Sequence, residues 1–190
     1  MRPRPYQKPH PPLARACTGD ASLVAMAKIG RPALIRGNSI NATGAKIKLY
    51  RDTMSAAGFS EEAVEKSLEQ TWVWREMHIA ETDDEAMDNF LPAHYDAYEH
   101  LEGVRAEWNP PKMEISMQRA PLGPSDYAET PNPDTSENLI GGYKRVAEQV
   151  ALMQDVGVRN LMLTNRGLVS QEKTKKSLTL LSEKIMPFFR

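Results

Sequence analysis

The chain has 190 residues, of which 41% are hydrophobic and 26% are charged, so it can bury the core of one domain or of part of a larger one. A net charge of −1 argues against a general attraction to nucleic acid or to an anionic membrane. The single cysteine, Cys17, excludes an internal disulfide framework, and the sequence has neither a secretory hydrophobic region nor a bilayer-spanning apolar run. We therefore expect a globular, cytoplasmic protein that binds neither nucleic acid nor membranes.

The first 12 residues are rich in proline, which occupies positions 3, 5, 9, 11 and 12. Proline fixes φ and lacks a backbone N–H donor, so residues 1–12 are predicted to be an extended surface connector that leads into a buried strand. A disordered tail, or a Pro-x-x-P ligand for a small adaptor module, also fits this composition. On the first interpretation, the folded domain comprises residues 13–190.

Strand and helix patterns alternate in the next part of the chain. Residues 13–18 and 32–35 are short apolar runs and are predicted to be buried strands. The alanine-rich residues 21–29 are predicted to form a helix that ends at Gly30, since glycine is favoured just after a helix. The following helix is indicated by an apolar face formed by Ile47, Tyr50, Met54 and Ala57.

The third predicted strand is residues 71–80, which are dense in β-forming side chains. Before it, residues 60–70 are predicted to be a short acidic helix or turn. After it, Thr82 and Glu85 have the spacing of a capping box, in which a hydroxyl and a carboxylate satisfy the first N–H groups of a helix. A long helix should begin there and end near Gly103.

Residues 108–138 are rich in Pro, Asn, Ser and Asp without periodicity, which predicts a long irregular excursion. They are followed by a helix ending at Gly157, a fourth strand over residues 158–163 and a last helix capped by Ser170. The expected inner face of that last helix consists of Thr174, Leu178, Leu181 and Ile185. This order predicts an α/β fold of about four parallel strands with covering helices and one irregular insertion.

In folds of this kind, ligands bind at the carboxyl ends of the strands, where one turn stands out. Gly19 lets a ligand approach the backbone closely, and Thr18 and Ser22 offer hydroxyls. The helix that follows directs unsatisfied N–H groups outward, which suits a phosphate. Ordinary capping of the helix by Thr18 or Asp20 explains the same residues, so both interpretations stay open.

Other chemistry is weakly indicated. The histidines at positions 10, 78, 94 and 100 include no pair with the i, i+4 spacing of a helical metal site, so we predict no metal and expect surface or partly packed side chains. Cys17 lies in an apolar strand without an obvious base beside it, which favours a buried inert thiol over a nucleophile. The sequence assigns no catalytic residue.

The chain resembles bacterial luciferase-like flavin-dependent monooxygenases in the order and spacing of several segments. Those similar to the central part of such enzymes are Pro3–Pro12, Ala16–Leu23 and Ala27–Leu34. Those similar to the last units of the barrel are Ile140–Val150, Gly157–Leu163 and Ser177–Phe189. The resemblance covers nearly the whole chain, with residues 108–138 matching least, but only the second half of the family's fold.

The resemblance implies the C-terminal half of a (β/α)8 TIM barrel that binds reduced FMN, or alternatively the deazaflavin F420, at the strand carboxyl ends. It implies oxidation of a small organic substrate with O2. Thr18, Gly19 and Ser22 match the turn that meets the flavin phosphate and ribityl chain, and Gly37 and Asn38 match positions near the isoalloxazine. The catalytic residues and the substrate are not assigned by it.

Because only half of the barrel is matched, the resemblance leaves several functions open. The first is a fragment or truncated form of a flavin-dependent monooxygenase that lacks the N-terminal half of the site and is active only with its missing half or not at all. The second is a catalytically inactive half-barrel that pairs with itself or binds a partner as a structural subunit. A half-barrel leaves sheet edges and inward side chains in need of a cover. A different α/β enzyme with an accidental resemblance is the third possibility.

Overall fold

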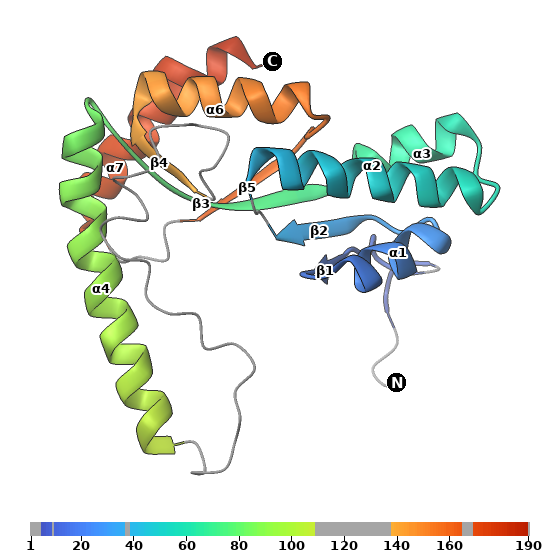
Figure 1. Ribbon diagram of the computed structural model, residues 1–190, viewed down its shortest axis with the longest axis horizontal. Coiled ribbons are helices and arrows are strands. Elements are labelled where there is room, and N and C mark those ends of the chain that lie inside the picture. The colour runs from blue at the N-terminus through green and yellow to red at the C-terminus, as the bar shows by residue number, and fades with distance from the viewer. Residues whose placement is uncertain (1–4, 9, 37–38, 109–137, 165–168, 190) are drawn as a thin grey trace. The chain divides into compact units, whose positions relative to one another are not determined.

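The computed structural model describes residues 5–8, 10–36, 39–108, 138–164 and 169–189 (Figure 1). The chain divides into two compact units, unit 1 with Met1–Arg75 and Met153–Met162, and unit 2 with Glu76–Leu152 and Leu163–Arg190. The strands are β1 (Arg15–Cys17), β2 (Ala33–Arg36), β3 (Trp72–Ala80), β4 (Leu139–Gly142) and β5 (Leu161–Thr164). None of the helices in the described part of the chain combines the length and apolar character needed to cross a bilayer.

The strands run parallel in the order β1-β2-β3-β4, and β5 also pairs with β3. In unit 1, Arg15–Cys17 of β1 align with Ala33–Ile35 of β2, and β2 aligns with the first residues of β3. In unit 2, the last residues of β3 align with β4 from Met77 opposite Leu139 to Ala80 opposite Gly142. The predicted parallel sheet with helices is therefore confirmed, with β4 as an unpredicted addition.

The core of unit 1 lies between one face of its strands and three helices. These are α1 (Asp20–Lys28), α2 (Ile40–Ala56) and α3 (Glu61–Leu68). Helix α1 packs against α2, and α2 packs against α3. The predicted inner face of α2 is confirmed for Ile47, Tyr50 and Met54, whereas Ala57 is exposed. Burial of these apolar side chains is the main force that closes unit 1.

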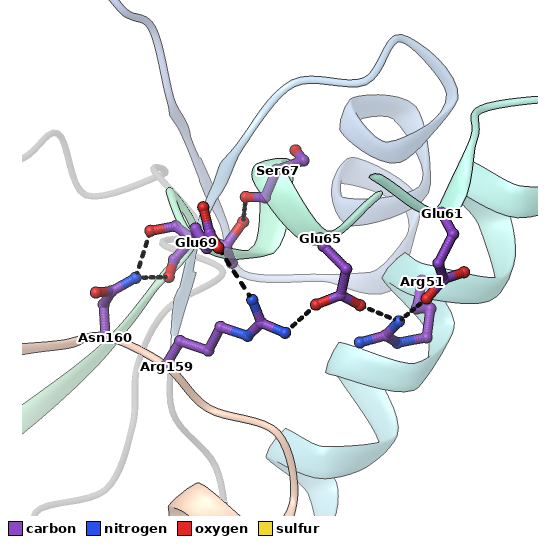
Figure 2. A network of polar contacts seen from close by, with 8 residues as sticks. Arg51, Glu61, Glu65, Ser67, Glu69, Arg159 and Asn160 are labelled. Atoms are coloured by element: carbon purple, nitrogen blue, oxygen red, sulfur yellow. Dashed lines mark hydrogen bonds and ion pairs between the residues drawn. The ribbon is translucent and has the colours of Figure 1, made fainter. Parts of the chain in front are cut away.

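A network of polar contacts joins α2, α3 and the segment before β5 within unit 1 (Figure 2). The Arg51 guanidinium donates to Glu61 at 2.9 Å and to Glu65 at 2.5 Å, and Arg159 donates to the other oxygen of Glu65. Asn160 donates through its amide to the carbonyls of Glu69 at 2.8 Å and Thr71 at 3.0 Å. A single partly exposed ion pair contributes about 0–1 kcal/mol. Through Arg159 and Asn160, the network links the segment before β5 to α3 and to the residues that follow α3.

Unit 2 is built on the second part of β3, on β4 and on several helices. They are α4 (Asp83–Trp108), α6 (Tyr143–Asp155, which ends in unit 1), α7 (Gln171–Leu180), a π-helical turn η2 (Leu181–Ile185) and a 3-10 turn η3 (Met186–Phe188). The start of α4 packs against β4. One buried apolar cluster joins the end of β3, α4 and β4 with Val169, which precedes α7, and contains Ala80, Ala86, Phe90, Ile140 and Val169.

The capping box at the start of α4 is confirmed in a modified form. The Thr82 hydroxyl accepts from the Glu85 N–H at 3.2 Å, but the Glu85 carboxylate accepts from the Glu81 N–H at 3.3 Å, one residue earlier than expected. The helix continues through Gly103 to Trp108, so the prediction that it ends at Gly103 was wrong. Gly103 is an exposed residue within α4, and a β-carbon added to it would have no heavy atom within 4 Å. The glycine therefore neither ends the helix nor serves a close contact there.

The predicted inner face of the last helix is partly wrong. Ile185 is buried, but Leu178 is 49% exposed and Ser177 takes the inward position. The Ser177 hydroxyl accepts from the Ile79 N–H of β3 at 2.8 Å. Burying a hydroxyl costs little folding free energy when the hydroxyl has a hydrogen-bond partner. Ser177 can therefore occupy a buried position where the apolar pattern predicted leucine.

Candidate cofactor site

The turn between β1 and α1 contains Thr18, Gly19 and Ser22 and lies at the carboxyl end of a strand, as predicted. Gly19 is the N-cap residue of α1, and no side chain forms a capping hydrogen bond there. The predicted alternative, capping by Thr18 or Asp20, is therefore absent from this turn. Uncapped N–H groups at a helix start carry the positive end of the helix dipole and suit an anion.

The backbone at Gly19 leaves space for a ligand. A β-carbon placed on Gly19 would have no heavy atom within 4 Å. Its φ of −112° and ψ of 161° are extended values that any residue adopts, so conformation does not require glycine here. The absence of a side chain at Gly19 instead keeps the first turn of α1 accessible.

The side chains around this turn are already oriented by local bonds. The Ser22 hydroxyl donates to the Gly19 carbonyl at 2.7 Å, so it must rotate before it can donate to a ligand. The Thr18 carbonyl accepts from the Lys46 ammonium at 3.1 Å. This contact holds a cation from α2 beside the carboxyl end of β1.

Lys46 is the residue that sequence reasoning missed at this turn. It is 28 positions from Thr18 in the chain, and only the packing of α2 against α1 brings it there. Its position one residue before the buried Ile47 places it at the border of the inner face of α2. This position in the sequence could have indicated that Lys46 lies near the core of unit 1. It could not have identified the β1–α1 turn as the segment that Lys46 contacts.

The second predicted part of the site follows β2. Gly37 and Asn38 lie outside the described residues, so their proposed proximity to the isoalloxazine stays a prediction. On their two sides, Arg36 ends β2, and Ser39 caps α2 by accepting from the Ala42 N–H at 3.3 Å. The Arg36 guanidinium lies over the ring of Trp74, with Cζ 5.9 Å from the ring centroid.

Unit 2 contains a buried histidine that the sequence did not single out. His78 is 1% exposed, and among the described residues neither of its ring nitrogens has a hydrogen-bond partner. Burial lowers the pKa of His78, the positive charge of Lys173 lowers it further, and Glu85 opposes both. His78 is therefore a neutral core residue at pH 7, more deeply packed than the surface or partly packed side chain predicted. The described residues contain no group of three or more His, Cys, Asp or Glu side chains placed to hold a metal.

Cys17 is buried at 1% exposure, and its thiol donates to the Arg15 carbonyl at 3.4 Å. The geometry thus agrees with the expected buried thiol.

Comparison with known families decides the membership of the chain. The profile of the family described as luciferase-like monooxygenase matches residues 1–160. The chain belongs to this family. Comparison with curated protein sequences found no significant match.

Solved structures of luciferase-like proteins share the fold. The monooxygenase RslO1 from Streptomyces bottropensis has a TM-score of 0.69 and 19% identity, with 100% of this chain and 52% of that chain covered. The FMN-bound oxygenating constituent of 3,6-diketocamphane monooxygenase from Pseudomonas putida has a TM-score of 0.60 and 14% identity, covering 95% and 50%. The coenzyme F420 dependent tetrahydromethanopterin reductase from Methanopyrus kandleri has a TM-score of 0.59 and 14% identity, covering 94% and 51%.

The luciferase-like chain thus spans about half the length of these solved structures. Its parallel sheet corresponds to part of their TIM barrels, as predicted.

Proposed function

We propose that the chain is the phosphate-binding part of a flavin-dependent monooxygenase that oxidises a small organic substrate with O2. The observation that carries this proposal is the β1–α1 turn, where an uncapped helix start, open space at Gly19 and the Lys46 ammonium lie together. Membership in the luciferase-like monooxygenase family supports it.

The residues of the turn fit a phosphate group. The N–H groups of the first turn of α1 donate to its oxygens, and Lys46 neutralises part of its charge after leaving the Thr18 carbonyl. The hydroxyls of Thr18 and Ser22 add donors once Ser22 has rotated away from Gly19. Bound reduced flavin supplies the electrons for the reaction with O2. The chain's own contribution at this turn is to bind and orient the cofactor.

The proposed cofactor is reduced FMN, with the deazaflavin F420 as the alternative. One solved neighbour is a complex with FMN and another depends on coenzyme F420, so the family relationship does not choose between them. Both cofactors carry a phosphate at the end of a ribityl chain, which the same turn can bind. We further propose that Gly37 and Asn38 lie near the ring system, and that a second half-barrel completes the site.

A titration of the 190-residue chain with FMN, followed by flavin fluorescence, tests the phosphate site. We expect Lys46→Gln to weaken FMN binding about tenfold or more, because a hydrogen bond to a charged group is worth about 1.5–3 kcal/mol. Lys46→Arg should retain most of the affinity, since it keeps the charge. The control is Lys48→Gln on the same helix, whose ammonium is exposed and paired with Asp52. Equal FMN affinity in the Lys46→Gln and Lys48→Gln variants contradicts the proposal.

A second candidate function is a non-catalytic half-barrel that pairs with itself. The observation that favours it is β1, which ends the strand order and has exposed residues Arg15 and Ala16. Unpaired edge strands are templates for association. Light scattering over a range of protein concentrations distinguishes the candidates: a concentration-dependent dimer that binds no flavin supports this second function, whereas a flavin-binding monomer excludes it.

A further inference from the structure

Unit 2 contains a cavity of about 590 Å³, which is within the range of sites that hold small molecules. One wall of the cavity is formed by α4, from Asp88 to His100, and the other by Val169, Ser170 and Lys173 at the start of α7. Both walls belong to the same compact unit. The position of one wall relative to the other is therefore a property of unit 2 alone.

The apolar part of the lining is continuous with the core of unit 2. Val169 lines the cavity and is also a member of the buried apolar cluster, where it is 6% exposed. Ala93 lines the cavity from α4 and packs against the same cluster. Because close-packed core side chains have little freedom to move, this part of the cavity is preformed.

The α4 wall is rich in hydrogen-bond acceptors. Asp88 and Asp96 line the cavity eight positions apart, about 12 Å along the helix axis. Pro92 lies between them and has no N–H group, so the Asp88 carbonyl lacks its usual donor in the helix. Asn89 and His100 add further polar groups to this wall. Two carboxylates and a backbone carbonyl favour a ligand with a cationic N–H donor.

The other wall carries a positive charge. Lys173 lines the cavity from the first turn of α7, and its side chain is exposed. Within the described part of the chain, the side chains of Asp88, Asp96 and Lys173 form no ion pair and no hydrogen bond. The opposite charges of the two walls therefore do not neutralise each other by direct contact, and each can bind a group of the other sign.

We propose that this cavity binds a small zwitterionic amino carboxylate, with its ammonium group beside Asp88 and Asp96 and its carboxylate at Lys173. The carbon chain between the two charged groups lies against Ala93 and Val169. The cavity belongs to unit 2 and the β1–α1 turn to unit 1, so this inference goes beyond the proposed function and does not rest on it.

An NMR titration of the 190-residue chain with 6-aminohexanoate tests the inference. Hexanoate and hexylamine are the matched ligands, since each lacks one of the two charges. We expect the amide signals that shift to lie mainly in residues 88–100 and 169–173. The zwitterion should bind about fivefold more tightly than either matched ligand, because each exposed ion pair adds a modest free energy.

Substitutions on the two walls should separate the two charge contributions. Lys173→Gln should remove the preference over hexylamine, and Lys173→Arg should retain it. The double variant with Asp88→Asn and Asp96→Asn should remove the preference over hexanoate. The controls are Lys175→Gln and Asp84→Asn, at exposed residues of the same two helices that do not line the cavity, and both should keep the wild-type preferences.

The inference is overturned if 6-aminohexanoate shows no saturable binding at tens of millimolar, or if the shifted signals lie mainly outside the two walls. Unchanged preferences in Lys173→Gln and in the double aspartate variant also overturn it. If FMN binds and 6-aminohexanoate does not, this inference fails alone. If 6-aminohexanoate binds at the cavity and FMN does not bind, the proposed function fails and the zwitterion site remains.

Discussion

At the scale of single residues, Gly19 illustrates how stability and binding can oppose each other. The residue has extended backbone angles and occupies the N-cap of α1 without a capping side chain. Aspartate and asparagine are the preferred residues at such a position because their side chains accept from the first free N–H groups. Their absence leaves those groups for a ligand.

We therefore predict that Gly19→Asp stabilises the fold and weakens FMN binding. The stability gain should be a few tenths of a kcal/mol, about the measured difference between these residues at an N-cap. FMN affinity should fall about tenfold or more, because the carboxylate occupies the N–H groups and repels the phosphate. Gly19→Asn caps the helix without the charge and should weaken binding less. Urea unfolding and flavin titration measure the two effects; unchanged FMN affinity in Gly19→Asp contradicts the assignment of the turn.

His78 makes a second prediction at the residue scale. Burial lowers its pKa in the folded protein, so between that lowered value and about 6.5 the unfolded chain binds a proton that the folded chain does not. The free energy of unfolding should therefore fall as the pH drops from 7.5 to 5.5. Glu65 and Glu85, whose pKa values are lowered, titrate below this window.

The variant His78→Leu should remove this pH dependence. At pH 7.5 it should be as stable as the wild type or up to about 1 kcal/mol more stable, because it removes two buried nitrogens without partners. His100→Gln, at an exposed residue, serves as the control and should retain the wild-type pH dependence. Urea unfolding at the two pH values provides the measurement. If the free energy of unfolding changes with pH equally in His78→Leu and the wild type, groups other than His78 cause the pH dependence.

At the scale of secondary-structure elements, the junction of β4 and α6 depends on close backbone approach. The Gly142 N–H donates to the Asp83 carboxylate at 2.6 Å, which links β4 to the start of α4. A β-carbon on Gly142 would lie 3.2 Å from backbone atoms of Thr82 and Asp83. Backbone cannot move aside as a flexible side chain can, so this contact explains why a strand ends in glycine.

We predict that Gly142→Ala lowers the free energy of unfolding of the chain by about 1–3 kcal/mol, the usual cost of overpacking. Gly103→Ala is the matched control, since Gly103 lies in α4 with open space around it. It should raise stability by about 0.5–1 kcal/mol, as expected for alanine in a helix. Thermal or urea unfolding compares the two variants. Equal effects in both would mean that the contact with Thr82 and Asp83 does not constrain the junction.

The elements also show what local sequence can predict. The apolar patterns located α2 and the strands β1, β2 and β3, and Ser170 was identified as the cap of α7, where it accepts from the Lys173 N–H at 3.4 Å. Strand β4 was missed because its sequence, Leu-Ile-Gly-Gly, has too little length and side-chain bulk for a strand pattern. The two glycines of β4 allow the Asp83 side chain to approach the strand closely. Asp83 is 59 positions away from Gly142 in the chain, so the local sequence of β4 could not predict this contact.

At the scale of the whole molecule, the parallel order of the strands and the position of the β1–α1 turn followed from alternating strand and helix patterns. The same patterns did not predict which distant side chains lie beside the β1–α1 turn. Lys46 reaches the turn only through the packing of α2 on α1, and the contact of Arg36 with the Trp74 ring depends on the register of β2 and β3. Both are products of tertiary packing between segments that are distant in sequence, so periodicity and motif spacing cannot reveal them.

The central claim is that the β1–α1 turn binds the phosphate of a flavin. Its most direct test is to measure the affinity of the wild-type chain for FMN and for riboflavin, which has the same ring system and ribityl chain but no phosphate. We predict at least about tenfold tighter binding of FMN, from one or more charge-assisted hydrogen bonds. Equal affinities for FMN and riboflavin, or no binding of either, would contradict the claim.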